Sequence, residues 1–105
     1  MTSEEMITRA GAALAAATPP RSRIILFGSQ ARGDADSASD FDFLVIEPEV
    51  RRPAAESVRL RRLLRDIPAA IDVIVVSEEL VGRRARVPGT MVDRALREGR
   101  VIAQS

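Results

Sequence analysis

Three aspartates occupy apolar surroundings in which a charged side chain requires a partner. Asp40 and Asp42 are two residues apart at the start of a β-forming run, and Asp72 is the second residue of another, Ile71–Val76. Side chains at i and i+2 of a strand share one face, so the first two carboxylates converge. Like charges this close require a counter-charge, which a divalent cation supplies, and an aspartate among branched apolar residues needs a pair or a metal.

A Gly28-Ser29 turn follows the apolar run that precedes these acids. Glycine lets backbone N–H groups approach a phosphate closely, and the serine hydroxyl adds a donor. Arg32 lies about one helical turn further on, within reach of a triphosphate oxygen; the alternative is a solvated arginine or an ion pair with Asp34 or Asp36. A phosphate cradle beside paired carboxylates favours two-metal phosphoryl or nucleotidyl transfer, in which the cations clamp the attacking and leaving oxygens.

Composition narrows the chemistry further. The 105 residues contain no Cys and no His, and all 16 basic residues are Arg. Disulfides, cysteine-ligated zinc, a histidine base, Schiff-base lysine chemistry and a P-loop lysine are therefore excluded. Any metal site must use oxygen ligands, which favours Mg²⁺ or Mn²⁺. The net charge of +1 gives no reason to expect nucleic acid as a partner. No apolar run approaches the roughly 20 residues of a membrane span, and the start lacks a basic signal region, so we expect a cytoplasmic protein.

Periodicity and breakers predict an α/β domain spanning residues 1–105. Helices are expected over residues 3–17, from Pro53 to the residue before Pro68, after a Ser77 cap, and from Met91 to a Gly99 C-cap. Strands are expected over residues 23–27, 41–47, 71–76 and 100–103. A turn or short helix is expected over residues 29–33, and loops over 34–39 and 81–89. Because the strands are continuously apolar, helices should cover at least one face of the sheet.

Structural alternatives exist for each candidate residue. Asp40 and Asp42 can be loop and strand-edge acids, Asp72 can face water, and Gly28-Ser29 alone often marks only a strand-to-turn transition. The arginines from Arg59 to Arg65 are expected on a solvated helix face. Arg83, Arg84 and Arg86 are expected in a solvated loop, or alternatively in a docking patch for an acidic partner or nucleotide phosphates.

The combined motif resembles that of a known family. Gly28-Ser29, ten residues and then Asp40-Phe41-Asp42 closely resembles the signature of the DNA polymerase β-like nucleotidyltransferase superfamily. The details Arg32-Gly33 and Ser39-Asp40, and the tail from Pro88 to Val101, are similar to its minimal nucleotidyltransferase (MNT) branch. The resemblance extends over nearly the whole chain from Ile24 onward.

This resemblance implies a polymerase β-like nucleotidyltransferase fold, with a small mixed sheet of three to four strands flanked by helices and a site at one end of the sheet. It implies that Asp40 and Asp42 bind two Mg²⁺ ions, with Mn²⁺ as an alternative. By the same resemblance Asp72 is the third acid, which ligates the catalytic metal and helps to activate the acceptor hydroxyl. Gly28 and Ser29 match residues that hold the triphosphate of ATP.

MNT proteins of the MntA type serve as antitoxins of HEPN/MNT toxin–antitoxin systems, so the resemblance implies a HEPN ribonuclease toxin as partner and AMP transfer to a tyrosine on it. The chain lacks the C-terminal helical domain with which larger members hold small substrates or RNA, so the acceptor is expected on a separate chain. Two alternatives stay open: an antitoxin that acts by binding alone, and a nucleotidyltransferase that modifies small molecules such as antibiotics. The sequence does not indicate an oligomeric state.

Overall fold

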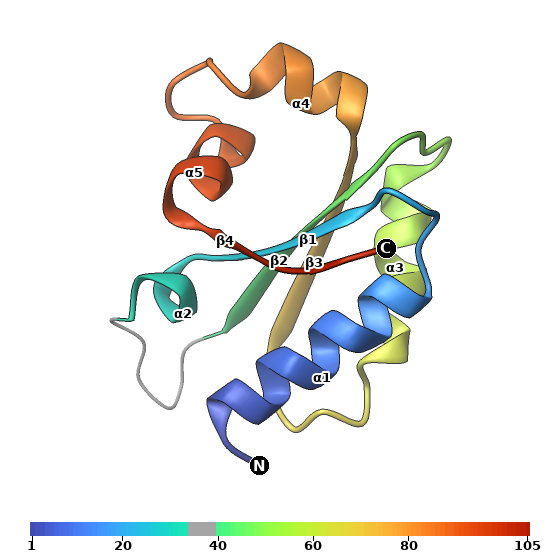
Figure 1. Cartoon of the computed structure of the whole chain (residues 1–105), viewed down its shortest axis with the longest axis vertical. Helices are drawn as coiled ribbons and strands as arrows, with labels where there is room; N and C mark the ends of the chain where they lie inside the picture. The colour runs from blue at the N-terminus through green and yellow to red at the C-terminus, as the bar shows by residue number, and fades with distance from the viewer. Residues whose placement is uncertain (34–39) are drawn as a thin grey trace.

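Four apolar runs form the strands of one sheet, and helices connect and cover them (Figure 1). The structure, a computed structural model, describes residues 1–33 and 40–105; the loop expected over 34–39 lies outside this part. The elements in chain order are α1 (Ser3–Ala16), β1 (Arg23–Phe27), α2 (Ser29–Arg32), β2 (Phe41–Glu47), α3 (Pro53–Leu63), β3 (Ile71–Ser77), α4 (Glu78–Arg84), α5 (Met91–Glu98) and β4 (Arg100–Gln104). The predicted α/β class is confirmed.

The strand order is β3-β2-β1-β4, and the sheet is mixed. β1 runs antiparallel to both β2 and β4, whereas β2 and β3 are parallel and are joined through α3. Asp42 lies opposite Asp72 in the β2–β3 pair, and Phe27 lies opposite Asp42 in the β1–β2 pair. The predicted strand acids therefore lie on neighbouring strands, beside the residue at which β1 ends.

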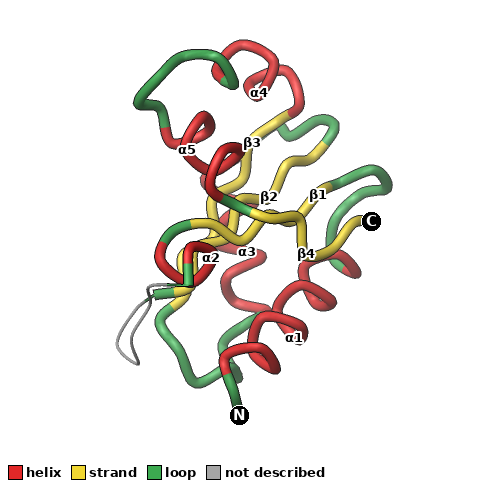
Figure 2. Tube along the Cα trace, turned by 60° about the vertical axis from the view of Figure 1, so that its left-hand side comes forward, coloured by secondary structure: helices red, strands yellow, loops and turns green. Residues whose placement is uncertain are grey.

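Helices cover both faces of the sheet, in agreement with the prediction that at least one face is covered. Figures 1 and 2 show α1 and α3 on one side of the strands and α4 and α5 on the other. Ile7, Leu14 and Leu60 pack with one set of strand residues, and Val81, Val92 and Ala95 pack with the other. Leu44, Ile46 and Val76 belong to this second core. Asp42 lies two residues before Leu44 in β2, and Asp72 lies four residues before Val76 in β3. Because alternate residues of a strand share a face, both aspartates lie on the face that α4 and α5 cover.

Helix α3 is shorter than expected. Its predicted apolar face included Leu64 and Ile67, but the helix ends at Leu63 and these two residues lie in the turns that follow. The N–H groups of Leu64 and Ile67 donate to carbonyls three residues earlier. A spacing of three suits such tight turns as well as a helix. Both side chains consequently remain buried, which the apolar pattern predicted.

The structure also differs from the prediction at residues 81–89, where a loop was expected, and in the conformation of the Gly99 C-cap. Residues 81–84 continue α4, because the Ser77 hydroxyl accepts from the Leu80 N–H and Val81 is buried against the sheet. Gly99 ends α5 with φ −86° and ψ 173°, an extended conformation and not the left-handed one. Glycine is needed there for space, since a Cβ would lie 2.4 Å from the Ala95 carbonyl oxygen.

A buried carboxyl group closes β2. Glu47 is 2% exposed, and its Oε2 has no hydrogen-bond partner in the described part of the chain. Burial first, and the neighbouring Glu56 second, raise the pKa of Glu47 to about 7. Hydrogen bonds from Arg59 lower the pKa of Glu56. Glu47 therefore carries the proton of this pair and can donate it to the Glu56 carboxylate.

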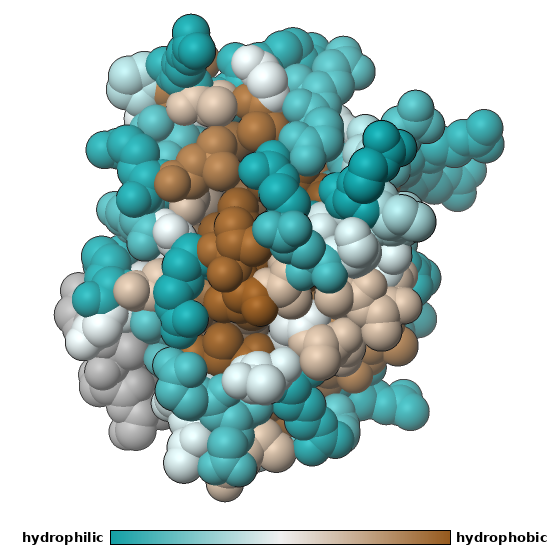
Figure 3. Space-filling model, viewed as in Figure 1, coloured by the Kyte–Doolittle hydropathy of each residue, from teal (hydrophilic) through white to brown (hydrophobic). Residues whose placement is uncertain are grey.

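The free edge at β4 is partly apolar at the surface. Figure 3, viewed from the same side as Figure 1, shows a band of hydrophobic side chains on the surface, bordered by hydrophilic ones. Val101 of β4 is 48% exposed. None of the helices in the described part of the chain has the length and apolar character needed to cross a membrane.

Candidate functional site

Two of the predicted acids meet at the start of the parallel strand pair. Asp42 is the second residue of β2 and Asp72 the second of β3, and the sheet register places them opposite each other. Asp42 is partly buried, Asp72 is exposed, and the charge of Asp72 acts on Asp42. The local sequence dictates this arrangement, because each aspartate follows one buried residue of its strand, Phe41 or Ile71.

The surroundings of Asp42 hold more negative than positive charge. Burial raises the pKa of Asp42, and the charges of Asp72 and Asp40 and the hydrogen bond to Asp72 raise it further. Arg94 is the opposing influence and lowers the pKa. A hard divalent cation would offset the same repulsion through oxygen ligands, which are the donors present here. The donor set therefore fits Mg²⁺ or Mn²⁺.

Asp40 stands apart from this pair. It is exposed, it immediately precedes β2, and it affects Asp42 through its charge. Across residues 1–33 and 40–105, no three acidic side chains converge closely enough to enclose a metal ion as they are placed. The structure thus brings Asp42 and Asp72 together and leaves Asp40 at their border.

The Gly28-Ser29 turn lies beside Asp42 of the acid pair. Gly28 has φ 77° and ψ −159°, a region that is essentially restricted to glycine. A Cβ at this position would lie 2.4 Å from Oδ2 of Asp42, so the missing side chain makes room for the carboxylate. The N–H groups of Ala31 and Arg32 donate to the Gly28 carbonyl. Within the described residues the Ser29 N–H and hydroxyl have no such partner, so they are available to a ligand.

A cavity of about 490 Å³ joins these groups. Its size is within the range usual for small-molecule sites. Its polar lining comes from helix α2 with its N-cap Gly28, from strands β2 and β3, and from helix α5: Gly28, Ser29, Arg32, Asp42, Asp72 and Arg94. Arginines and backbone donors therefore share one cavity with the carboxylate pair. That combination suits a polyanion held together with cations.

Arg32 lines the cavity as predicted for a phosphate ligand, but it is also held by an acid. Its Nη1 lies 3.1 Å from Oε2 of Glu98. The alternative of an ion pair with Asp34 or Asp36 falls on residues outside the described part of the chain. Glu98 belongs to α5, so this contact ties α2 to that helix.

Helix α5 contributes two residues that sequence reasoning missed, Met91 and Arg94. Their i, i+3 spacing puts them on one helix face, but only the packing of α5 decides that this face meets the cavity. The exposed Arg94 forms no ion pair with any described residue, and its charge lowers the pKa of Asp42. No local motif distinguishes it from the other arginines.

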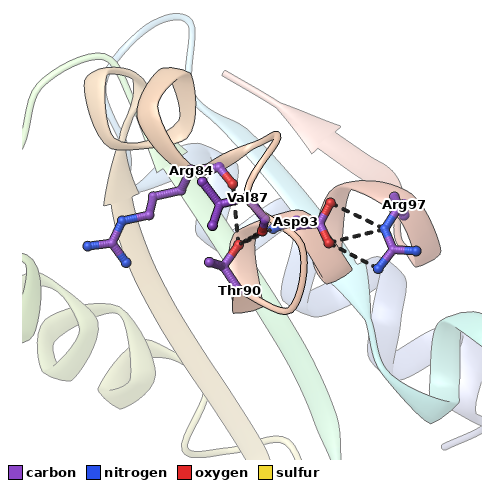
Figure 4. Close-up of polar contacts among 5 residues, drawn as sticks. All are labelled: Arg84, Val87, Thr90, Asp93 and Arg97. Carbon is purple, nitrogen blue, oxygen red and sulfur yellow. Dashed lines mark hydrogen bonds and ion pairs between the residues drawn. The ribbon is translucent and has the colours of Figure 1, made fainter.

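A polar network fixes the start of α5 (Figure 4). The Thr90 hydroxyl accepts from the Asp93 N–H and donates to the carbonyls of Val87 and Arg84. Asp93, which is 7% exposed, pairs with Arg97 one turn later. These bonds join the end of α4 to α5 and so hold Arg94 beside the acids.

Comparisons with known proteins agree with this geometry. A family model described as "Nucleotidyltransferase domain" matches residues 13–102, whereas no curated protein sequence matches the chain. The fold is similar to a crystal structure of a toxin–antitoxin with AMP-PNP, with 19% identity over 99% of this chain and 75% of that one and a TM-score of 0.62. It is also similar to a putative nucleotidyltransferase from Sulfolobus solfataricus, with 22% identity over 95% and 78% and a TM-score of 0.64. These likenesses show the polymerase β-like nucleotidyltransferase fold.

Proposed function

The chain belongs to the nucleotidyltransferase domain family, and from that premise we propose that it transfers AMP from ATP to a hydroxyl group of a partner protein. One observation carries this proposal: the Asp42–Asp72 pair lies in the same cavity as the Gly28-Ser29 turn, and the Asp42 carboxylate occupies the space that a side chain at Gly28 would need. A nucleotide whose phosphates occupy the turn would therefore present them to the carboxylates.

The residue roles follow from this placement. Asp42 and Asp72, with Asp40 at their border, would hold the divalent cations. Bound cations would neutralise the charge that develops on the phosphate oxygens. Gly28 and Ser29 would bind the triphosphate through backbone and hydroxyl donors.

The arginines at the cavity serve the same ligand. Arg94 would neutralise part of the charge of the acids and phosphates, because it lines the cavity and has no ion pair among the described residues. Arg32 would contribute a phosphate contact while its bond to Glu98 keeps α2 close to α5.

In the proposed reaction the acceptor hydroxyl oxygen bonds to the α-phosphorus of ATP. The bond from that phosphorus to the bridging oxygen breaks, and pyrophosphate leaves. The hydroxyl proton passes to the carboxylate of Asp72, which is exposed and so open to an incoming acceptor. Holding the acceptor and the nucleotide in line supplies much of the rate enhancement of such a reaction.

We propose a HEPN ribonuclease toxin as the partner, with the chain as its antitoxin. The MNT-like signature from Gly28 to Asp42 supports this choice. A protein of the same fold has been crystallised as a toxin–antitoxin with AMP-PNP, which is consistent with an adenine nucleotide as the donor.

The test incubates the purified chain with labelled ATP, Mg²⁺ and the protein encoded by the neighbouring gene, and then weighs that protein by mass spectrometry. A gain of AMP units that Asp42→Asn abolishes is the expected result. An Arg65→Glu chain serves as the control, because this exposed arginine lies away from the cavity. Neutralisation of the partner without a mass gain, retained in Asp42→Asn, would refute catalysis and indicate an antitoxin that acts by binding.

A further inference from the structure

A second hollow adjoins the acid pair on the other side of β3. This groove, of about 270 Å³, is lined by residues of α3 and of the start of β3: Ser57, Val58, Arg61, Arg62, Ile71, Asp72 and Val73. Asp72 and Val73 line both this groove and the larger cavity. A molecule lying in the groove would therefore reach Asp72 from the side opposite the proposed nucleotide.

The groove exposes part of a sheet edge, because β3 is the outermost strand. Two outward-facing backbone groups of β3 are already satisfied by side chains of α3. Arg61 Nε donates to the Ile71 carbonyl at 2.8 Å, and the Val75 N–H donates to Ser57 Oγ at 3.1 Å. Free sheet edges attract further strands, and such side-chain bonds block that pairing locally.

Val73 lies between these two blocked positions. The N–H and C=O of one strand residue point to the same side, and alternate residues repeat that direction. Val73 thus faces outward with Ile71 and Val75, while its neighbours pair with β2. Within residues 1–33 and 40–105, no side chain bonds to the Val73 backbone as Arg61 and Ser57 bond to the flanking positions. The Val73 N–H and C=O therefore have no hydrogen-bond partner among the described residues, and Val73, which is 8% exposed as a whole, lines the groove next to Asp72.

The charge of the groove indicates what it would bind. Arg61 and Arg62 line it, and neither forms an ion pair within the described part of the chain. Arg59 on the same helix is by contrast paired with Glu56. Val58 is 51% exposed and adds an apolar contact. Two guanidinium groups that lack an ion pair, an apolar side chain and a strand position without a hydrogen-bond partner suit an extended segment that carries carboxylates.

We infer that this groove, lined by α3 and β3, docks the acceptor: an extended, acidic, hydroxyl-bearing segment of the partner protein that pairs with the Val73 backbone beside Asp72. The inference rests on the proposed transfer to a protein hydroxyl and adds where that protein binds. Pairing at Val73 would hold the docked segment one residue from Asp72. The hydroxyl group of the segment then loses its proton to the Asp72 carboxylate, while its oxygen bonds to the α-phosphorus and pyrophosphate leaves.

The binding test uses a fluorescent short acidic peptide with a central tyrosine as the probe, read by anisotropy. Arg62→Glu should weaken binding about tenfold or more, because it replaces an attraction by a repulsion across a few ångströms. Arg65→Glu makes the same change of charge at an exposed position outside the groove and should leave binding unchanged. Equal effects of the two variants would overturn the inference.

Backbone pairing is tested separately by amide hydrogen exchange and by a second probe. The Val73 amide should exchange quickly in the free chain and slowly with the probe, whereas the Val75 amide is already bonded to Ser57 and should change little. The same peptide with a methylated backbone should lose binding, and equally tight binding would overturn the inference. Slow Val73 exchange that depends on the concentration of the chain alone would also overturn it, since a second copy would then be the occupant.

Nucleotide binding separates this inference from the proposed function. Arg62 does not line the nucleotide cavity, so Arg62→Glu should bind an ATP analogue with Mg²⁺ as the unchanged chain does. Full transfer to the partner by Arg62→Glu would overturn the docking inference and leave the proposed function standing. Probe binding that protects Val73 in a chain that transfers nothing would support docking and refute the proposed function.

Discussion

Gly28→Ala provides a sharp test of the site, because two separate features require glycine at this position: the backbone conformation and the space beside Asp42. Its backbone conformation, φ 77° and ψ −159°, is one that residues with a Cβ rarely adopt. An added Cβ would also lie 2.4 Å from Oδ2 of Asp42, where real Cβ contacts below 3.0 Å are essentially never seen. The substitution therefore strains the turn and displaces a proposed metal ligand together.

The two effects differ in size and in readout. Strain in this backbone region costs about 1–3 kcal/mol of unfolding free energy. For a domain of this length that cost lowers Tm by roughly 4–20 °C. Displacement of the Asp42 carboxylate should in addition weaken Mg²⁺-dependent binding of an ATP analogue by about tenfold or more, or about 1.4 kcal/mol.

The assay combines urea unfolding with calorimetric titration of the ATP analogue, well below the Tm of every variant. Gly89→Ala is the matched control, since Gly89 also has a positive φ of 84° but no described atom within 4 Å of an added Cβ. It should lose about 1–2 kcal/mol of stability and bind nucleotide normally. If Gly28→Ala also binds nucleotide normally, the contact between turn and carboxylate does not organise the site.

Three further substitutions test separate parts of the structure. Asp42→Asn should raise the urea midpoint while abolishing transfer, because it removes a partly buried charge that repels Asp72; a lower midpoint would contradict this. The unfolding free energy should fall as pH rises from about 5 to 8, because the raised pKa of Glu47, about 7, favours the folded state fully below pH 4.5 and this contribution is lost as pH passes 7. Glu47→Gln should flatten a change of about 3 kcal/mol, and an unchanged pH profile would exclude the protonated pair with Glu56. Gly82→Ala should stabilise α4 by about 0.5–1 kcal/mol in urea titrations, since nothing described lies within 4 Å of the new Cβ, and any loss of stability would indicate an unseen contact.

The elements that the sequence predicted well are those with strong local signals. β1 and β2 begin and end as expected, because branched apolar runs stop at Gly28 and before Pro48. Thr2 and Glu5 form the predicted capping box of α1. The positions of Asp42 and Asp72 near the starts of their strands are also as predicted, and the parallel pairing of β2 with β3 then places them opposite each other.

Features set by packing were beyond local reasoning. The end of α3 was missed because Leu64 and Ile67 keep an apolar spacing that helices and tight turns share. Arg94 resembles the other arginines in sequence, and only the burial of Val92 and Ala95 turns it toward the cavity. The open backbone at Val73 depends on which strand lies at the edge of the sheet, which no residue pattern here specifies.

The meeting of the turn with the acids depends on strand direction most of all. Residues 28–40 join β1 to β2, and a connection of that length allows either a parallel crossover or an antiparallel return. In the parallel case, the end of β1 would lie at the far end of β2, away from Asp42. The observed antiparallel pairing puts Phe27 opposite Asp42, and parallel pairing of β2 with β3 puts Asp72 on its other side. The mixed sheet thus brings the end of β1 and the starts of β2 and β3 together at one end of the sheet. A sheet of uniform strand direction would separate them.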